Sequence, residues 1–227
     1  ANATGCSSIW GGSAPSTPYT VNKEGRGPAW ENSLFEDGAE FGYGMNLAVN
    51  ARQTAAADLA RSLAQKEDTP AAVTLCAQKW LNHRRETEGS RTTGQALAAA
   101  LAKAISAGTG NQGELQALYN MRDMFGQKSV WAFGGDGWAY DIGFGGVDHV
   151  LASGEDVNVF VFDTEVYSNT GGQASKASNI GEVCQFAAAG KEISKKSLSE
   201  IAMTYGYIYV AQIALGANPA QAVKAIA

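Results

Sequence analysis

The chain has 227 residues and a hydrophobic share of 45%, which is enough to bury a substantial core in one large domain or two small ones. Its formal net charge of −5 provides no broad basic face, so nucleic acid and anionic membranes are poor partners. No stretch approaches about 20 consecutive apolar residues, which excludes a membrane span, and no secretory signal is recognisable.

Three cysteines, Cys6, Cys76 and Cys184, are an odd number at wide spacing. This pattern argues against a disulfide framework and favours a reducing, cytoplasmic compartment. The chain opens without methionine, on residues typical of the end of a strand, and it stops at 224–227 inside a helical pattern without a C-cap. We therefore expect residues 1–227 to be a segment of a longer polypeptide whose remaining domains are its partners.

The first fifth of the chain predicts a loop and then a helix. Residues 7–29 are rich in Gly, Ser and Pro, which favours a loop, and the bulky Trp10 and Trp30 indicate that this loop packs on something. Residues 30–52 place apolar side chains on roughly one helical face. Glycine lowers helix propensity by about 1 kcal/mol relative to alanine. The glycines of this helix therefore indicate close approach by another backbone or by a ligand: Gly38, Gly42 and Gly44.

Residues 53–127 differ in character, being rich in Ala, Gln and charged residues without β-branched runs. Two or three amphipathic helices fit this stretch, with breaks near 68–70, 89–90 and 108–110. We interpret it as an α-helical insertion within one domain, and it shows no residues that indicate chemistry.

From residue 128 onward, strands and helices alternate. Strands are predicted at 129–134, 157–163 and 207–213; a helix is predicted at 141–153, and a capping box at 197–200 opens a later one. This alternation predicts an α/β fold, in which a parallel sheet is covered by helices on both faces. Ligands of such sheets bind at the carboxyl ends of the strands.

Two polar loops follow the first two of these strands, and they predict a metal and diphosphate site. Asp136 offers a carboxylate, Thr164 a hydroxyl and Val166 a backbone carbonyl, which are oxygen ligands that Mg²⁺ accepts. Gly135 and Gly137 let the backbone approach phosphate groups. The loops are separated by residues 138–163, which are 26 positions and suffice for one helix and a returning strand. A lone Gly-Asp-Gly would be a plain turn; the strand context and the second loop favour the site.

The strings that carry these loops resemble pyruvate:ferredoxin (flavodoxin) oxidoreductases, as do two strings near the start: 135–143, 163–173, 1–11 and 27–37. The resemblance is close over 1–52 and 128–215 and loose over the insertion. It is a resemblance to the thiamine-diphosphate domain towards the C-terminal end of that enzyme. It implies oxidative decarboxylation of pyruvate to acetyl-CoA and CO₂, with coenzyme A as co-substrate. Electrons would pass through [4Fe–4S] clusters to ferredoxin or flavodoxin, in a homodimer.

The resemblance also implies roles for individual residues. Asp136, Thr164 and the Val166 carbonyl would bind Mg²⁺, although many other thiamine-diphosphate families have asparagine at the threonine position. Asn169 would face the cofactor and the 2-oxoacid and donate to a developing oxyanion, or it caps the following Gly-Gly turn instead. The loops around the diphosphate would be formed by Gly135, Asp136, Gly137, Trp138, Thr164, Glu165, Val166, Tyr167, Ser168 and Asn169.

Cys6 would ligate the [4Fe–4S] cluster nearest the cofactor, as the matching cysteine of the family does. Such a cluster needs four thiolates, so the other ligands would lie outside this chain, and Cys76 and Cys184 are interpreted as structural. The glutamate that activates the cofactor would come from another domain. Three alternatives stay open: a fused pyruvate:NADP⁺ oxidoreductase, a relative acting on another 2-oxoacid, and a non-catalytic scaffold or interface piece.

Overall fold

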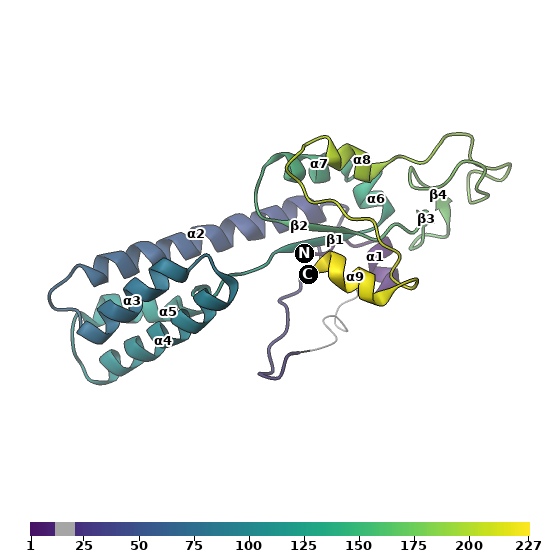
Figure 1. Ribbon diagram of the computed structural model, residues 1–227. Helices are drawn as coiled ribbons and strands as arrows, with labels where there is room; N and C mark the ends of the chain where they lie inside the picture. Colours follow the sequence, from purple (N-terminus) through teal and green to yellow (C-terminus); the bar gives the residue numbers. More distant parts are fainter. Residues whose placement is uncertain (12–20) are drawn as a thin grey trace. The chain divides into compact units, whose positions relative to one another are not determined.

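The computed structural model describes residues 1–11 and 21–227 (Figure 1). The chain divides into two compact units, one made of residues 1–44 and 130–227 and the other of residues 45–129. Residues 12–20 of the predicted loop lie outside the described residues. In the part of the chain that is described, no helix has the length and apolar character needed to cross a membrane.

The second unit is an assembly of helices. It contains most of α2 (Gly38–Ala64), followed by α3 (Ala71–His83), α4 (Thr87–Ser106), α5 (Gln112–Asn120) and the short 3₁₀ helix η1 (Arg122–Met124). Its core is formed by buried apolar side chains from all four α-helices, with Trp80 donating a hydrogen bond of 2.7 Å from Nε1 to the carbonyl of Phe125. This bond satisfies the one polar atom of an otherwise apolar side chain.

Two of the three helix breaks predicted here fall between helices, at 68–70 and 108–110, and the third is wrong. Gly89 and Ser90 lie in the first turn of α4, and the chain turns at 84–86 instead. The amide of Ser90 donates to the carbonyl of Glu86, and its hydroxyl accepts from the amide of Gln127 at 2.9 Å. Ser90 therefore belongs to the helix because both its backbone and its side chain are satisfied there.

The first unit contains the predicted parallel sheet. Strand β1 (Trp131–Gly134) pairs in parallel with β2 (Asn158–Val161), in a register that places Gly134 opposite Val161. The crossover between them contains α6 (Asp136–Ala139) and α7 (Phe144–Ala152). Apolar side chains of β1 and of both helices form the core of this unit, including Ala132, Trp138 and Val147. The predicted α/β class with a parallel sheet is confirmed.

The start of α2 packs closely against this sheet. A Cβ atom on Gly38 would lie 2.8 Å from the backbone nitrogen of Ala3, and one on Gly42 would lie 3.2 Å from Cβ of Ala132. A side chain at Gly38 would collide with the neighbouring backbone, and one at Gly42 would be a tight fit against the strand, so both glycines permit the close approach that the sequence indicates. Gly44 has nothing within 4 Å and plays no such part.

The predicted start of this helix at residue 30 is wrong, because α2 begins at Gly38. The preceding residues bridge to the N-terminal segment instead: the amide of Asn2 donates to the carbonyl of Glu31, and the amide of Ser33 donates to the carbonyl of Asn2, both at 2.9 Å. The backbone hydrogen bonds that a helix would need here are thus made with a distant strand-like segment.

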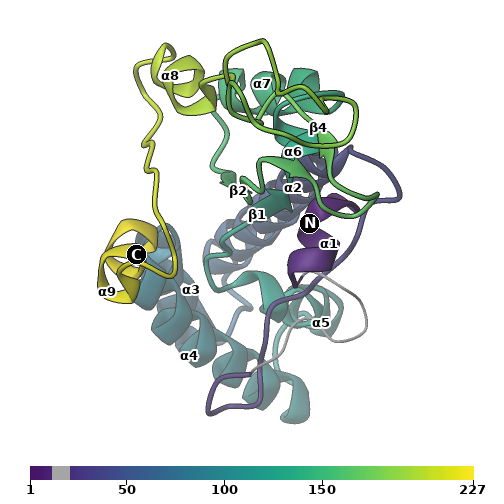
Figure 2. The ribbon, with the colours of Figure 1, turned by 90° about the vertical axis from the view of Figure 1, so that its right-hand side faces the viewer.

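Three other differences concern local elements. The helix α1 (Cys6–Trp10) overlaps the start of the predicted loop, and the ring centroid of Trp10 is 4.3 Å from that of Phe162. Helix α8 (Leu198–Met203) begins after Ser197 as expected, but the Ser197 hydroxyl makes no capping bond. The predicted strand at 207–213 is absent and forms an extended connection between α8 and α9 (Pro219–Ile226; Figure 2). Tyr209 there is 77% exposed, and no neighbouring strand pairs with the segment.

Candidate functional site

Asp136 lies at the carboxyl end of β1, where the strand turns into α6. Gly135 occupies the N-cap position, and Asp136 is the first residue of the helix and is fully buried. Its Oδ1 accepts a 3.0 Å hydrogen bond from the amide of Thr164, and its Oδ2 accepts a 2.9 Å bond from the hydroxyl of Ser175. Both donors fix the carboxyl group, because its two oxygens are held by different segments.

The segment after β2 brings a hydroxyl group to this carboxylate and a backbone carbonyl to that hydroxyl. The hydroxyl of Thr164 lies 3.3 Å from Asp136 Oδ1 and 2.9 Å from the carbonyl oxygen of Val166. The parallel register places the ends of β1 and β2 side by side, and the amide of Phe162 extends the ladder by donating to the carbonyl of Gly134 at 2.8 Å. The single hydroxyl proton can serve only one acceptor at a time, so the three oxygens together favour a cation.

The environment of Asp136 opposes its negative charge. Burial raises the pKa of this carboxyl to about 6, and the nearby charge of Asp163 adds to the effect. The hydrogen bonds from Thr164 and Ser175 act in the opposite direction by stabilising the carboxylate. A buried carboxylate of this kind is poorly solvated, and a cation at this place would compensate for the lost water.

The loop after Thr164 is shaped by a short hairpin. Strand β3 (Val166–Tyr167) pairs antiparallel with β4 (Gln173–Ala174). Glu165 adopts a left-handed conformation with φ of 67°, which is uncommon for a residue other than glycine. Its carbonyl accepts a hydrogen bond from the hydroxyl of Ser178, which holds the backbone in this conformation. The carbonyl of Val166 is thereby presented to Thr164.

Cys6 lies directly beside these two loops. Its Sγ is 3.5 Å from Oδ1 of Asn169 and 4.0 Å from the carbonyl oxygen of Val166. A Cβ atom on Gly135 would lie 2.3 Å from Cβ of Cys6, so the cysteine packs on the backbone of the Asp136 turn. Three segments that are far apart in the sequence, around residues 6, 136 and 166, thus meet at one place.

Two buried polar atoms near these loops have no hydrogen-bond partner among the described residues: Nε1 of Trp138 and Oγ of Ser168. An unpaired buried donor costs about 1–3 kcal/mol, so such atoms call for a partner. Both residues belong to the loops predicted to surround a diphosphate. A hydroxyl and an indole N–H are donors that phosphate oxygens accept.

Two tyrosines and a lysine contact carboxylates next to these loops. The hydroxyl of Tyr140 donates to Asp163 at 2.9 Å, and that of Tyr167 donates to Asp141 at 2.6 Å. Lys195 lies 2.7 Å from the carboxylate of Asp163. Burial and these carboxylates raise the pKa of both tyrosines, which keeps them protonated as donors.

The structure therefore brings most of the predicted site residues together. A chain of contacts joins five of them: Asp136 contacts Thr164, Thr164 contacts Val166, and Cys6 contacts both Val166 and Asn169. The side chain of Tyr167 is committed to Asp141, and that of Glu165 is exposed and 3.9 Å from Lys195. Among the described residues, no three His, Cys, Asp or Glu side chains form a metal-binding group. The oxygen cluster contains only one carboxylate and is not of that kind.

Ser175, Ser178 and Glu36 contribute to these loops and were not anticipated. The two serines hold Asp136 and Glu165, and Glu36 lies against Gly137. Serines after a Gly-Gly turn are common in loops, so nothing in the sequence distinguishes them from ordinary turn residues. Glu36 lies 100 residues before Asp136, and only the fold brings the two together.

Comparison with known families gives a match over residues 71–227 to the family described as "Thiamine pyrophosphate enzyme, C-terminal TPP binding domain". The chain belongs to this family. Thiamine pyrophosphate is thiamine diphosphate, so the predicted cofactor is that of the family. The matched region contains both strand tips and the loops that follow them.

Curated relatives extend the similarity to the whole chain. Over its full length the chain is 54% identical to the pyruvate:ferredoxin oxidoreductase of Moorella thermoacetica and to the pyruvate-flavodoxin oxidoreductase of Klebsiella pneumoniae, and it covers 19% of each. Over 99% of its length it is 48% identical to the mitochondrial pyruvate dehydrogenase [NADP(+)] of Euglena gracilis, of which it covers 12%. The predicted resemblance is confirmed, and the chain spans about a fifth or less of these relatives.

Proposed function

We propose that this chain is the thiamine-diphosphate-binding part of a larger oxidoreductase that converts pyruvate and coenzyme A to acetyl-CoA and CO₂. Electrons would pass through [4Fe–4S] clusters to ferredoxin or flavodoxin. The observation that carries the proposal is the meeting of Asp136, Thr164 and Val166 at the strand tips, in contact with Cys6. The named activities of the relatives support the choice of reaction. The homodimer and the cytoplasmic location stay predictions.

The three oxygens fit Mg²⁺. Asp136 would supply a carboxylate, Thr164 a hydroxyl and Val166 a carbonyl, and Mg²⁺ commonly takes a small number of protein oxygens and completes its shell with phosphate and water. The raised pKa of Asp136 supports this assignment, because a divalent charge would relieve the burial of the carboxylate. The hydroxyl of Ser175 would continue to orient the other carboxylate oxygen.

The surrounding donors fit a diphosphate. The backbone at Gly135 and Gly137 presents no side chain, and the unpaired Ser168 hydroxyl and Trp138 indole N–H are available as donors. When bound, thiamine diphosphate supplies a carbon nucleophile that adds to the carbonyl of a 2-oxoacid and accepts the electron pair left by CO₂. The residues of this chain would hold the diphosphate, exclude water beneath it and fix the metal.

Cys6 would serve as a ligand of the electron-accepting cluster, and Asn169 would serve as an oxyanion donor. The distance of 3.5 Å between Cys6 Sγ and Asn169 Oδ1 supports this pair of roles, because the cluster would then lie beside the bound 2-oxoacid. The amide nitrogen of Asn169 would donate to negative charge on the substrate carbonyl oxygen. Cys6 would supply one of four thiolates, and the others would come from the remaining domains.

A second candidate has a specific observation in its favour. The Euglena relative is named as an NADP⁺ enzyme, and its identity of 48% is close to that of the flavodoxin relatives. The site would be the same, and only the final electron acceptor would differ. Reduction of NADP⁺ by the complete polypeptide with pyruvate and coenzyme A, without added ferredoxin or flavodoxin, would select this candidate.

The proposal is tested by calorimetric titration of thiamine diphosphate with Mg²⁺ into the complete polypeptide. Asp136→Ala should weaken binding at least about 100-fold, because it removes the only carboxylate of the oxygen cluster. Asp156→Ala is the matched control, since Asp156 is exposed in the same unit. Equal affinity in wild type and Asp136→Ala would remove the metal assignment, and no binding to wild type would remove the proposed function.

A further inference from the structure

Glu36 lies in a position where a carboxyl group is unfavourable. It precedes α2, is half-buried, and the charges that act on it are all negative: Asp136, Asp141 and Asp37. The pKa of Glu36 is raised to about 7, mainly by burial and further by these negative charges. Burial and like charges both disfavour the ionised form of this carboxyl group.

The carboxyl of Glu36 packs against two glycines. A Cβ atom on Gly5 would lie 2.7 Å from Glu36 Oε1, and one on Gly137 would lie 2.7 Å from the same oxygen. Gly5 directly precedes Cys6, and Gly137 directly follows Asp136. One oxygen atom therefore occupies the space that both glycines leave free, between the turn that carries the cysteine and the turn that carries the carboxylate.

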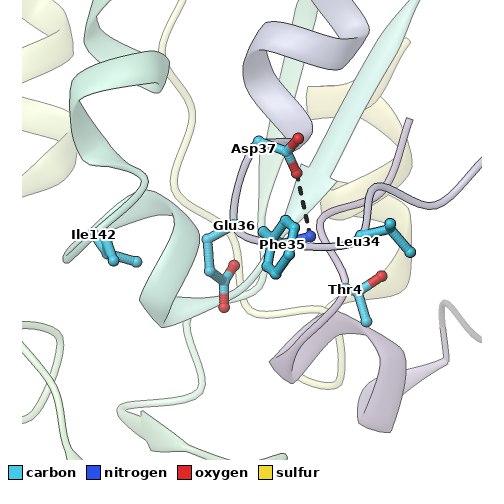
Figure 3. A pocket seen from close by; sticks show the side chains of 6 residues that line it. All are labelled: Thr4, Leu34, Phe35, Glu36, Asp37 and Ile142. Atoms are coloured by element: carbon cyan, nitrogen blue, oxygen red, sulfur yellow. Dashed lines mark hydrogen bonds between the residues drawn. The ribbon is translucent and has the colours of Figure 1, made fainter.

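The backbone around Glu36 holds it in this place. Its carbonyl oxygen would lie 2.5 Å from a Cβ atom on Gly143, so the backbone of this segment is in contact with the turn before α7. Its side chain is one of six that line an open pocket of about 420 Å³ (Figure 3). The other lining side chains are Thr4, Leu34, Phe35, Asp37 and Ile142.

We propose that Glu36 is a positioning residue of the cofactor site, which sets the spacing between the Cys6 turn and the Gly135–Gly137 turn. The inference rests on the proposed function, since Cys6 and Asp136 are cofactor ligands only there. The contact depends on the size and reach of the side chain. Glutamine has the same shape as glutamic acid and preserves the contact, whereas alanine leaves the space between the two glycines empty.

The test uses the complete polypeptide with its clusters assembled. Two properties are measured: the affinity for thiamine diphosphate with Mg²⁺ by calorimetry, and the state of the clusters. The clusters are followed by the electron paramagnetic resonance spectrum of their reduced form and by their midpoint potential. Glu36→Ala should weaken cofactor binding about tenfold, as loss of supporting contacts around a metal site does. It should also change the signal of the cluster bound by Cys6. Glu36→Gln should match wild type in both, and the exposed Glu192→Ala is the matched control.

A second variant tests the same contact in case Glu36→Ala does not fold. The three atoms nearest to a Cβ on Gly5 all belong to Glu36, so Gly5→Ala displaces the flexible carboxyl without touching backbone. Gly5→Ala should reproduce the changes seen in Glu36→Ala, and combining the two should add nothing further.

The outcomes separate the two proposals. If wild type binds the cofactor and Asp136→Ala does not, but Glu36→Ala and Gly5→Ala leave affinity and cluster signal unchanged, the role of Glu36 is refuted and the proposed function stands. If Glu36→Gln is as impaired as Glu36→Ala, the negative charge matters and the spacing role is wrong. If wild type does not bind, the proposed function itself fails.

Discussion

The helical unit of residues 45–129 and the α/β unit differ in what they bury. The helical unit has an apolar core, and its ion pairs, such as Arg52–Asp123 and Arg91–Glu88, lie at the surface. The α/β unit buries Asp136 completely, together with several serines and Asn2. Because burying a charged group costs stability unless it is paired, the helical unit has the simpler apolar core, whereas the α/β unit carries the cost of a buried carboxyl group.

The exposed surface shows the same contrast. Most of the large apolar side chains that are exposed belong to the α/β unit, including Leu34, Ile142 and Phe186, which are 84%, 85% and 91% exposed. The helical unit exposes few of them, such as Leu75. An apolar surface of this extent is typical of a unit that contacts other protein, which agrees with a chain that spans only 19% of its bacterial relatives.

The contrast predicts that the helical core can be damaged without harm to the site. Leu97→Ala should lower the free energy of unfolding by about 2–5 kcal/mol, because Leu97 is fully buried in the helical core and its removal leaves a cavity. Urea denaturation checks this, and calorimetry should find unchanged affinity for thiamine diphosphate at a temperature where the variant is folded.

Leu75→Ala is the matched control for Leu97→Ala. Leu75 lies in α3 of the same unit and is 53% exposed, so its loss should change the free energy of unfolding by less than about 0.5 kcal/mol. A large loss of cofactor affinity in folded Leu97→Ala would contradict the division of labour between the two units.

The complementary prediction is a substitution that weakens cofactor binding by the α/β unit and leaves the unit folded. Thr164→Val deletes the hydroxyl that lies between Asp136 and Val166 but keeps the backbone amide that donates to Asp136. The affinity for Mg²⁺ with thiamine diphosphate should fall about tenfold, since one of the proposed metal ligands is lost. Calorimetry on the complete polypeptide measures it.

Thr54→Val is the corresponding control, because Thr54 is exposed on α2 in the helical unit. Its affinity for the cofactor should equal that of wild type. Wild-type affinity in Thr164→Val as well would show that the hydroxyl is not a metal ligand, and the oxygen cluster would then need a different third member.

The sequence predicts the parts of the fold that follow from continuous patterns. The apolar runs that form β1 and β2 and the polar residues after them were sufficient to predict that Asp136 and Thr164 meet. The prediction of a strand at 207–213 is wrong because an apolar, aromatic run forms a strand only when a neighbouring strand pairs with it. The sequence pattern alone does not show whether such a neighbour is present. The late start of α2 has the same origin, since the bridge to Asn2 is a contact between distant residues.

For the candidate site, the sequence predicted which oxygen-bearing residues meet at the strand ends, and it did not predict which residues support them. Asp136, Thr164 and Val166 carry oxygen atoms at the ends of strands, which is a local signal. Ser175 and Glu36 act by touching those residues from other segments, at 39 and 100 positions along the chain from Asp136. Such contacts arise only after folding, so a single sequence contains no pattern that reveals them.

The smallest predicted effect concerns the stability lost when Glu36 is ionised near Asp37, Asp136 and Asp141. The pKa of Glu36 is raised from 4.5 to about 7, so the folded protein binds more protons than the unfolded chain between these values. Stability contributed by the protonated form is therefore present below pH 4.5 and is lost as the pH rises to about 7. Glutamine at this position stays neutral at every pH in this range. The free energy of unfolding of Glu36→Gln should therefore exceed that of wild type by about 1 kcal/mol at pH 8, after allowance for solvent screening.

The gain should shrink as the pH is lowered towards 5 and should be measured by urea denaturation of chain 1–227 in EDTA, so that no divalent cation is bound. Glu192→Gln, an exposed change in the same unit, is the control. A gain in Glu36→Gln that is the same at pH 5 and pH 8 would mean that proton binding is not its cause. A lower free energy of unfolding in Glu36→Gln than in wild type at pH 8 would mean that the Glu36 carboxylate stabilises the α/β unit. Glu36 would then no longer be an example of a group in that unit whose burial costs stability.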